Sequence, residues 1–208
     1  MKSFEKTVPE GYSLALYIDA RKMSFGIIFN VIALLVMTAT VGIALIPILM
    51  GGGIMQIFDS DPTVGVIVYL SFMASIIIYT VLHELVHGAA YKILTGEKLT
   101  FGMSWSCAYC GVPNVHVYRY VALVAVCAPL VLFTLLFVPL TVWLYGVNYL
   151  AYVAAAALLG IHLGGCSGDI YVLLLLLFRF KDRKTLMRDT GPEQFFYTYE
   201  GTVIENAD

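Results

Sequence analysis

The sequence predicts an all-α membrane protein with four transmembrane helices and a short β-hairpin in the loop between the second and third helices. Its 208 residues are 60% hydrophobic and only 12% charged, which is outside the usual range of soluble globular domains. Three uncharged stretches cover residues 23–58, 62–82 and 120–168. A helix needs about 20 apolar residues to cross a bilayer, so the third stretch is long enough for two spans.

We therefore expect spans at about 24–50, 64–92, 120–145 and 149–178, and the segment from Gly146 to Asn148 offers a turn between the last two. The first span follows several acidic residues and has no small-residue cleavage site, so it is expected to be a retained span and not a signal peptide. Residues 1–208 are expected to form a single integral membrane domain, with tails at 1–23 and 179–208.

The basic residues predict the orientation of these spans. All 12 Lys and Arg residues lie before the first span, after the fourth, or at or beyond the end of the second and before the third. The connection between the first two spans instead holds Asp59 and Asp61. By the positive-inside rule, we expect a multi-pass protein of the cell membrane with both termini and the middle loop in the cytoplasm.

The middle loop has strand signals. Residues 100–106 alternate polar or small side chains with large apolar ones, and residues 115–118 are strand-like. Gly111 and Pro113 lie between these segments as turn signals, so the two segments are expected to pair as a hairpin. Such a hairpin could offer an edge to an extended substrate segment, or it could only cap the cytoplasmic face.

The second span ends in His83-Glu84-Leu85-Val86-His87, which matches the metalloprotease pattern H-E-x-x-H. Residues four apart share a face of a helix, so both imidazoles can bind one Zn²⁺ while Glu84 reaches a water beside the metal. Ionisable residues at membrane depth are costly to insert and are candidates for function. The motif therefore predicts a zinc site within the membrane domain.

A third ligand is required, because a catalytic zinc usually takes three protein ligands and leaves one position open. Of the 14 acidic residues, only Glu84 and Asp169 fall inside the predicted spans. His83 lies 19 residues after Val64 and Asp169 lies 20 after Tyr149, which corresponds to about 29 and about 30 Å along a helix. Since both spans run in the same direction, Asp169 should reach the depth of His83.

Two more histidines are candidate substrate-binding or supporting residues. His162 lies seven residues before Asp169, about 10 Å along a straight helix, so it could share the metal only if the helix breaks. It could instead line the cavity or bond to a neighbouring span. His116, in the middle loop, could bind the substrate or the transition state, or be an ordinary loop histidine.

Four small residues precede Asp169: Gly160, Gly164, Gly165 and Gly168. They could allow close contact between helices or local unwinding of the span, or they could serve only as a structural packing surface.

Four cysteines are present, and disulfides are not expected in a reducing compartment. Cys107 and Cys110 form a C-x-x-C pair in the middle loop, which could serve redox chemistry, metal binding or only packing. A second pair that would complete a zinc site is absent from the sequence.

Taken together, several segments resemble the small prokaryotic zincin membrane peptidases grouped as a domain of unknown function, which are similar in layout to the site-2 class of intramembrane metalloproteases. The resemblance rests on the zinc motif and on Pro9-Glu10-Gly11-Tyr12, His116 leading to Ala128-Pro129-Leu130, and Ser167-Gly168-Asp169. It implies a zinc ion held by His83, His87 and Asp169, with Glu84 as general base. Site-2 proteases usually carry Asp-Gly, whereas here Gly168 precedes the aspartate and Ile170 follows it.

These features predict a membrane-embedded zinc metalloprotease that hydrolyses peptide bonds of membrane-associated or transmembrane substrates near the cytoplasmic side. The expected cofactor is Zn²⁺, and the expected partners are a peptide or membrane-protein substrate and the lipid bilayer, with no nucleic acid. The alternative is a non-proteolytic metal-binding membrane carrier or adaptor, but such a site has no need of Glu84 as a base. A di-iron hydroxylase is disfavoured because four histidines cannot supply its histidine-rich ligand shell.

Overall fold

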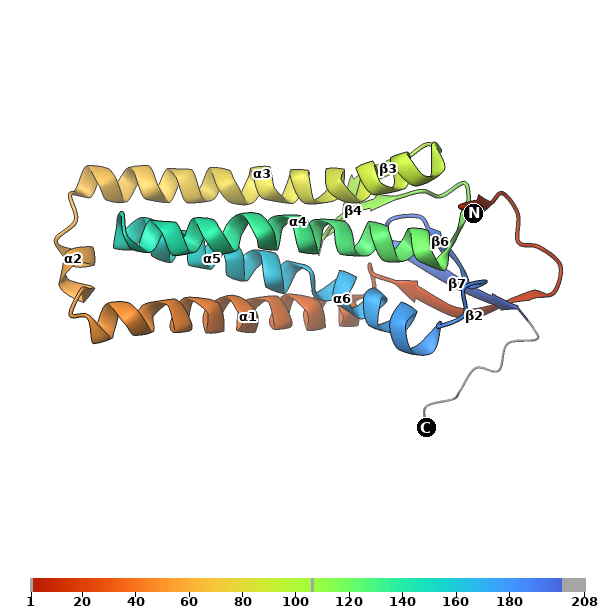
Figure 1. The fold of residues 1–208 in the computed structure, drawn as a ribbon, viewed down its shortest axis with the longest axis horizontal. Coiled ribbons are helices and arrows are strands. Elements are labelled where there is room, and N and C mark those ends of the chain that lie inside the picture. Colours follow the sequence, from red (N-terminus) through yellow and green to blue (C-terminus); the bar gives the residue numbers. More distant parts are fainter. Residues whose placement is uncertain (1, 106, 200–208) are drawn as a thin grey trace. The chain divides into compact units, whose positions relative to one another are not determined.

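The computed structural model describes residues 2–105 and 107–199, so Ser106 of the predicted hairpin and residues 200–208 of the predicted tail lie outside the described part. The chain is mostly helical (Figure 1). Its helices are α1 (Met23–Met50), α2 (Ile54–Phe58), α3 (Pro62–Thr95), α4 (Arg119–Tyr145), α5 (Tyr149–Gly165), α6 (Ser167–Leu174) and a π-helical turn (Leu175–Arg179). Its strands are β1 (Phe4–Glu5), β2 (Tyr12–Asp19), β3 (Thr100–Met103), β4 (Ala108–Gly111), β5 (His116–Tyr118), β6 (Leu186–Asp189) and β7 (Glu193–Tyr199).

Within the described residues, four helical segments are long and apolar enough to cross a membrane: Met23–Met50, Pro62–Thr95, Arg119–Tyr145 and Tyr149–Arg179. Their bounds lie within three residues of the predicted spans. Local signals fix two of the starts. Asp61 accepts a hydrogen bond from the Thr63 amide at 2.7 Å before Pro62, and Asn148 accepts one from the Ala151 amide at 2.9 Å. Four apolar helices are consistent with a multi-pass membrane protein.

The fourth predicted span is not one uninterrupted α-helix. α5 ends at Gly165, Cys166 caps it, and α6 begins at Ser167. The segment then continues as the π-helical turn from Leu175 to Arg179. The predicted span at 149–178 is confirmed as a membrane-length helical segment, and within it the helix is interrupted at Cys166, three residues before Asp169.

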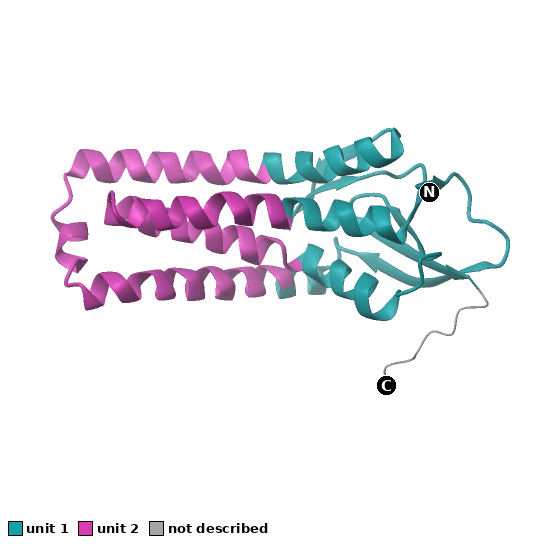
Figure 2. Cartoon of the chain, viewed as in Figure 1, with its two compact units in different colours: residues 1–28, 81–129, 168–208 teal, residues 29–80, 130–167 magenta. Residues whose placement is uncertain are grey.

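The chain divides into two compact units, coloured separately in Figure 2. Unit 1 comprises residues 1–28, 81–129 and 168–208, and unit 2 comprises residues 29–80 and 130–167. The boundaries fall inside α1, α3, α4 and α6, so each of these helices contributes to both units. A single domain over residues 1–208 stays a prediction.

Unit 2 is built from helices whose outer surface is apolar. Leu35, Ile43, Ile77 and Leu135 are each more than 60% exposed, which suits contact with lipid. α5 packs closely on α1, because a Cβ atom added at Gly160 or Gly164 would lie 2.7 Å or 2.6 Å from the Cα atom of Met37 or Ala33. Of the alternatives for the glycine run, these two positions support close helix contact.

Unit 1 contains a five-stranded antiparallel sheet in the order β1-β5-β6-β7-β2. Its strands come from the N-terminal tail, the middle loop and the C-terminal tail. Its core is formed by buried side chains of the sheet and of neighbouring helices, among them Val117, Val121, Leu176, Met187 and Phe196. The sequence predicted a short hairpin in the middle loop, and the structure adds this five-stranded sheet, to which both tails contribute strands.

The middle loop does contain a hairpin, but its pairing differs from the predicted one. β3 pairs with β4, whereas β5 lies between β1 and β6 in the five-stranded sheet. The reversal is tighter than expected because the Ser104 amide donates to the Cys107 carbonyl oxygen at 2.8 Å. Residues 115–118 are therefore left free to join strands from the tails.

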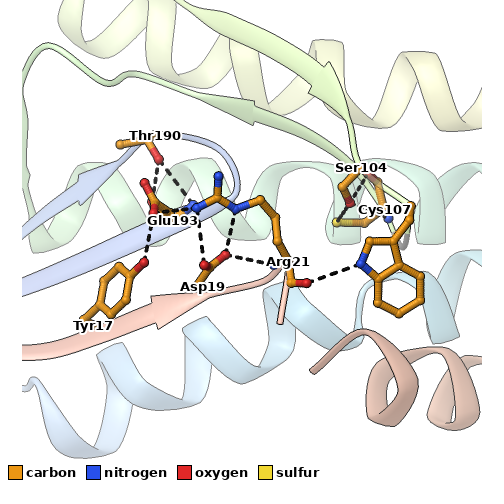
Figure 3. A network of polar contacts seen from close by, with 8 residues as sticks. Tyr17, Asp19, Arg21, Ser104, Cys107, Thr190 and Glu193 are labelled. Carbon is orange, nitrogen blue, oxygen red and sulfur yellow. Dashed lines mark hydrogen bonds and ion pairs between the residues drawn. The ribbon is translucent and has the colours of Figure 1, made fainter. Parts of the chain in front are cut away.

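A polar network ties the hairpin turn to the end of β2 (Figure 3). Asp19 and Glu193 are directly opposite in the β2–β7 register, and Arg21 binds both carboxylates, at 2.9 Å from Nε and 2.6 Å from Nη2. Hydrogen bonding to Arg21 lowers the pKa of Asp19. The Trp105 indole N–H also donates to the Arg21 carbonyl oxygen at 3.3 Å. Arg21 thus bridges two carboxylates that would otherwise repel each other, and its carbonyl oxygen contacts the hairpin turn.

Candidate metal centre

The zinc motif lies on an uninterrupted part of α3. His83 and His87 are each 8% exposed, and their rings meet edge to face with centroids 4.9 Å apart. This arrangement follows from their spacing, since residues four apart project from the same face of a helix. Both imidazoles therefore point into unit 1 next to one another.

Asp169 joins them from a distant part of the sequence. It lies in the first turn of α6, just after the break at Cys166. Its Oδ2 atom is 3.2 Å from His83 Nε2, and its Oδ1 atom is 3.4 Å from His87 Nε2. The structure thus brings together one donor atom from each of the three side chains, all within 4.8 Å of one another.

The donor set fits a zinc ion. Zinc binds imidazole nitrogen and carboxylate oxygen at about 2.0–2.2 Å in a tetrahedral arrangement, so ligand atoms lie about 3.3–3.5 Å apart. His83 Nε2 lies 3.2 Å from Asp169 Oδ2 and His87 Nε2 lies 3.4 Å from Asp169 Oδ1, so each imidazole is at about that spacing from one of the two carboxylate oxygens. The Nδ1–H group of His87 also donates to the Ala125 carbonyl oxygen at 2.8 Å, which leaves Nε2 as the available donor. The roles of these three residues as ligands stay a prediction.

Glu84 lies on the same helix but outside this donor set. It is half-buried, and the hairpin lies beside it, because a Cβ atom added at Gly88, one turn further along α3, would be 2.7 Å from the Phe101 ring. Glu84 also lies close enough to His83, His87 and Asp169 to interact with them electrostatically. A carboxylate beside the ligands, and not among them, is in the place that a general base requires.

His116 lies elsewhere in unit 1, in β5 of the five-stranded sheet. Its side chain is buried and meets the Tyr197 ring edge to face at 5.3 Å. Among the described residues, its Nδ1 atom has no hydrogen-bond partner. Burial, followed by the charge of Arg188, lowers the pKa of His116. The structure does not bring it into the three-residue donor set, and its role in substrate binding stays a prediction.

His162 belongs to unit 2 and is fully buried. Its Nδ1 atom is hydrogen-bonded to the Tyr79 hydroxyl at 2.9 Å, and its Nε2 atom to the Thr134 hydroxyl at 3.0 Å. Tyr79 and Thr134 lie on α3 and α4, so His162 connects α5 to two other spans. This is the bonding to neighbouring spans that the sequence left open as one alternative.

The C-x-x-C pair has the character of packing. Cys107 is exposed and lies 3.4 Å from the Ser104 hydroxyl, whereas Cys110 is buried. Burial first, and then the charges of Asp189 and Glu84, raise the pKa of Cys110 to about 12. A neutral, buried thiol is a poor nucleophile and a poor metal ligand, which disfavours the redox and metal interpretations.

Sequence reasoning missed one buried polar pair near the motif. The Tyr91 hydroxyl donates to Asp189 Oδ2 at 2.7 Å, and both residues are buried. Tyr91 could have been found, because it lies four residues after His87 on the same helix face. Asp189 could not, because its approach to α3 depends on the C-terminal tail returning to the sheet.

Residues 76–183 match the protein family described as "Putative zincin peptidase", a segment that includes every residue of the candidate centre. Comparison with curated proteins and with solved structures gave no match. Since the match covers more than half of the sequence, the chain belongs to the putative zincin peptidase family.

Proposed function

We propose that this protein is a membrane-embedded zinc metalloprotease that hydrolyses peptide bonds of membrane-associated or transmembrane substrates. One observation carries the proposal: donor atoms of His83, His87 and Asp169 lie within 4.8 Å of one another, with the Glu84 carboxylate beside them on α3. Membership of a putative zincin peptidase family supports a metallopeptidase.

His83, His87 and Asp169 would hold the zinc, which supplies a Lewis acid and lowers the pKa of water that it binds. A carboxylate oxygen of Glu84 takes the proton from the attacking water and passes it to the leaving amine. Ala125 fixes the ring of His87 through Nδ1, so the imidazole keeps one tautomer and one orientation. Asp169 would add a carboxylate oxygen to the two imidazole nitrogens of the ligand set.

The hairpin is the proposed binding surface for an extended substrate. β3 pairs with β4 on one side only, so its other edge is available within the two-stranded sheet. β3 also lies against the motif helix, because a Cβ atom added at Gly88 would be 2.7 Å from the Phe101 ring. A substrate segment that adds to this edge would be extended, and an extended segment exposes its amides to water.

We also propose that the site acts on the cytoplasmic side of the cell membrane and that both termini face the cytoplasm. The one-sided placement of Lys and Arg supports this orientation. Since the hairpin lies in the middle loop, the same assignment places the proposed substrate edge in the cytoplasm.

Metal analysis combined with a cleavage assay tests the function. Purified protein in detergent should contain about one zinc per chain, because the site has one set of three ligands. It should cleave a quenched fluorescent peptide library or fluorescein-labelled casein. Glu84→Gln keeps the size of the side chain and should keep zinc, but turnover should fall by roughly 10²- to 10⁴-fold. His83→Ala should lose metal and activity together.

Zinc binding without cleavage under any condition would favour the carrier or adaptor alternative. Cleavage by zinc-loaded Glu84→Gln at the parent rate would remove the general-base role. The comparison requires equal zinc content, detergent and substrate in all samples.

A further inference from the structure

One acidic group near the zinc motif, besides Glu84 and Asp169, is not used by the proposed chemistry. Asp189, the last residue of β6, is 5% exposed and is the only acidic residue that the described part of the chain buries fully. Burying a carboxylate is costly unless hydrogen bonds replace its water. The partners of Asp189 should therefore show what it holds in place.

The two carboxylate oxygens bind two different elements. Oδ2 accepts the Tyr91 hydroxyl of α3 at 2.7 Å, and Oδ1 accepts the backbone amide of Gly191 at 2.8 Å. Tyr91 is itself only 2% exposed. Because Tyr91 lies one turn after His87, its hydroxyl fixes the face of α3 that carries a proposed zinc ligand. Asp189 thus connects that face to the turn that follows β6.

The turn that follows β6 also contacts the end of β4. The Val112 amide donates to the Asp189 carbonyl oxygen at 2.8 Å. A Cβ atom added at Gly111 would lie 2.2 Å from the Gly191 nitrogen, so the two backbones touch and leave no room for a side chain. Gly191 has a φ of +99°, which side chains other than glycine's rarely adopt. The position of β4 is therefore set directly by the turn at Asp189.

β4 also returns to α3 through the hairpin. Cys110 lies opposite Phe101 of β3 in the strand register, and a Cβ atom added at Gly88, one turn after Glu84, would lie 2.7 Å from the Phe101 ring. A closed path therefore runs from α3 through Tyr91 and Asp189 to β4, and back to α3 through Phe101, beside the turn that carries Glu84. The path joins the hairpin to α3 at two points along the proposed site.

We propose that Tyr91 and Asp189 are positioning residues that hold β4 at a fixed distance from the Glu84 carboxylate. The inference rests on the proposed function for its catalytic meaning, but its structural content is independent of proteolysis. Neither residue belongs to the donor set or reaches the reacting atoms through the contacts described. Their loss should move β4 and the base without removing the metal.

Hydrogen–deuterium exchange of the full-length, zinc-loaded protein in detergent tests the proposal directly. In Tyr91→Phe and in Asp189→Ala, the amides of residues 108–112 should exchange about tenfold faster, as expected for loss of a buried hydrogen bond. Zinc per chain should stay at the parent value. Asp189→Asn can still accept from Gly191 and donate to Tyr91, so its exchange should stay within about twofold of the parent.

Tyr118→Phe is the matched control, because Tyr118 also donates to a carboxylate at 2.7 Å, that of Glu5, but it lies in β5. This variant should leave exchange in residues 108–112 unchanged. Where casein is cleaved, Tyr91→Phe should lower kcat with little change in KM, whereas Tyr118→Phe should change neither.

Unchanged exchange in Tyr91→Phe and Asp189→Ala would overturn the proposal, and so would equal acceleration in Tyr118→Phe. Tyr91→Phe removes a single oxygen atom, so it decides the question if Asp189→Ala does not fold. If the parent and Glu84→Gln are equally inactive on casein, the proposed function fails, while the exchange data still decide the positioning role.

Discussion

Asp169 is the one proposed zinc ligand that lies outside the H-E-x-x-H helix, and so it tests whether the centre joins two segments of the chain. Its two oxygens face different imidazoles, at 3.2 Å from His83 and 3.4 Å from His87. Removal of this side chain should leave two nitrogen donors on one helix, which is an incomplete set for catalytic zinc.

We expect Asp169→Ala to lower zinc occupancy after a chelator challenge by roughly 10- to 100-fold or more, since even supporting residues of metal sites have effects of this size. His162→Ala and His116→Ala should retain more zinc, because neither residue belongs to the donor set with Asp169. Zinc per protein is measured by atomic emission. Full zinc in Asp169→Ala, together with loss in His162→Ala, would show that the ligand assignment is wrong.

The buried carboxylate of Asp189 predicts that the stability of the protein depends on pH. Burial is the largest influence on it and raises its pKa from 3.8 to about 6. The folded state therefore binds this proton more tightly than the unfolded state, so stability should fall as pH rises from about 4 to about 6. At about 1.4 kcal/mol per pKa unit, the change is on the order of 1 to 3 kcal/mol. Asp189→Asn should remove it, as measured by unfolding midpoints in detergent.

Asp19 provides a control, because its contribution to stability should depend on pH in the opposite direction. Its pKa is lowered, first by its hydrogen bond to Arg21, so its contribution is present above the unfolded pKa and is lost as pH falls through the folded value. Asp19→Asn should therefore lower stability at neutral pH and have little effect near pH 3, a modest change because the pair lies at the surface. Parallel pH profiles for Asp19→Asn and Asp189→Asn would contradict both assignments.

At the level of elements, helices were predictable and sheet pairing was not. The apolar core of a bilayer favours helices, whose backbone groups are hydrogen-bonded within the segment, so the spans followed from charge-free stretches and local signals such as Asp61 and Asn148. β2 instead pairs with β7, at the other end of the chain, and no local pattern marks a partner so distant. β5 was assigned to the wrong partner for the same reason.

The candidate site shows the same difference between residues that are close in the sequence and residues that only the fold brings together. Both histidines and Glu84 share one helix, so their spacing alone indicated the arrangement. Asp169 could be suggested because few carboxylates lie inside the spans, and the glycine run before it left local unwinding open without marking Cys166 as the place of the break. Asp189 depends on the five-stranded sheet, and it was missed along with the strands of the tails.

The packing of α5 on α1 in unit 2 gives a prediction for adjacent glycines. A Cβ atom at Gly164 would lie 2.6 Å from the Ala33 Cα atom, which is backbone and cannot move aside cheaply. Gly164→Ala should therefore destabilise the protein by about 1–3 kcal/mol through overpacking. Gly165→Ala meets nothing within 4 Å, so the helix preference for alanine should leave stability unchanged or raise it by up to about 1 kcal/mol. Thermal unfolding in detergent distinguishes them, and equal destabilisation would refute the close contact.

At the scale of the whole molecule, the number of spans must put the basic segments on one side of the membrane. Four spans place the two termini on the same side, and they place the middle loop on that side as well. All 12 Lys and Arg residues lie in the segments assigned to this side or at the ends of the adjoining spans. An odd number of spans would separate the basic tails from each other, so the charge pattern supports an even number.

Accessible single cysteines test this topology. In a background without Cys107, Cys110, Cys127 and Cys166, cysteine is placed at one of three exposed positions: Asp59, Lys98 or Arg183. An impermeant thiol reagent added to intact cells should label only the cysteine at position 59, because the proposed orientation has the connection between the first two spans facing outward. The cysteines at positions 98 and 183 should be labelled only after the membrane is opened. Labelling of positions 59 and 183 from the same side would refute the four-span topology, whereas labelling of 98 and 183 from outside, with 59 protected, would preserve the spans and invert the orientation.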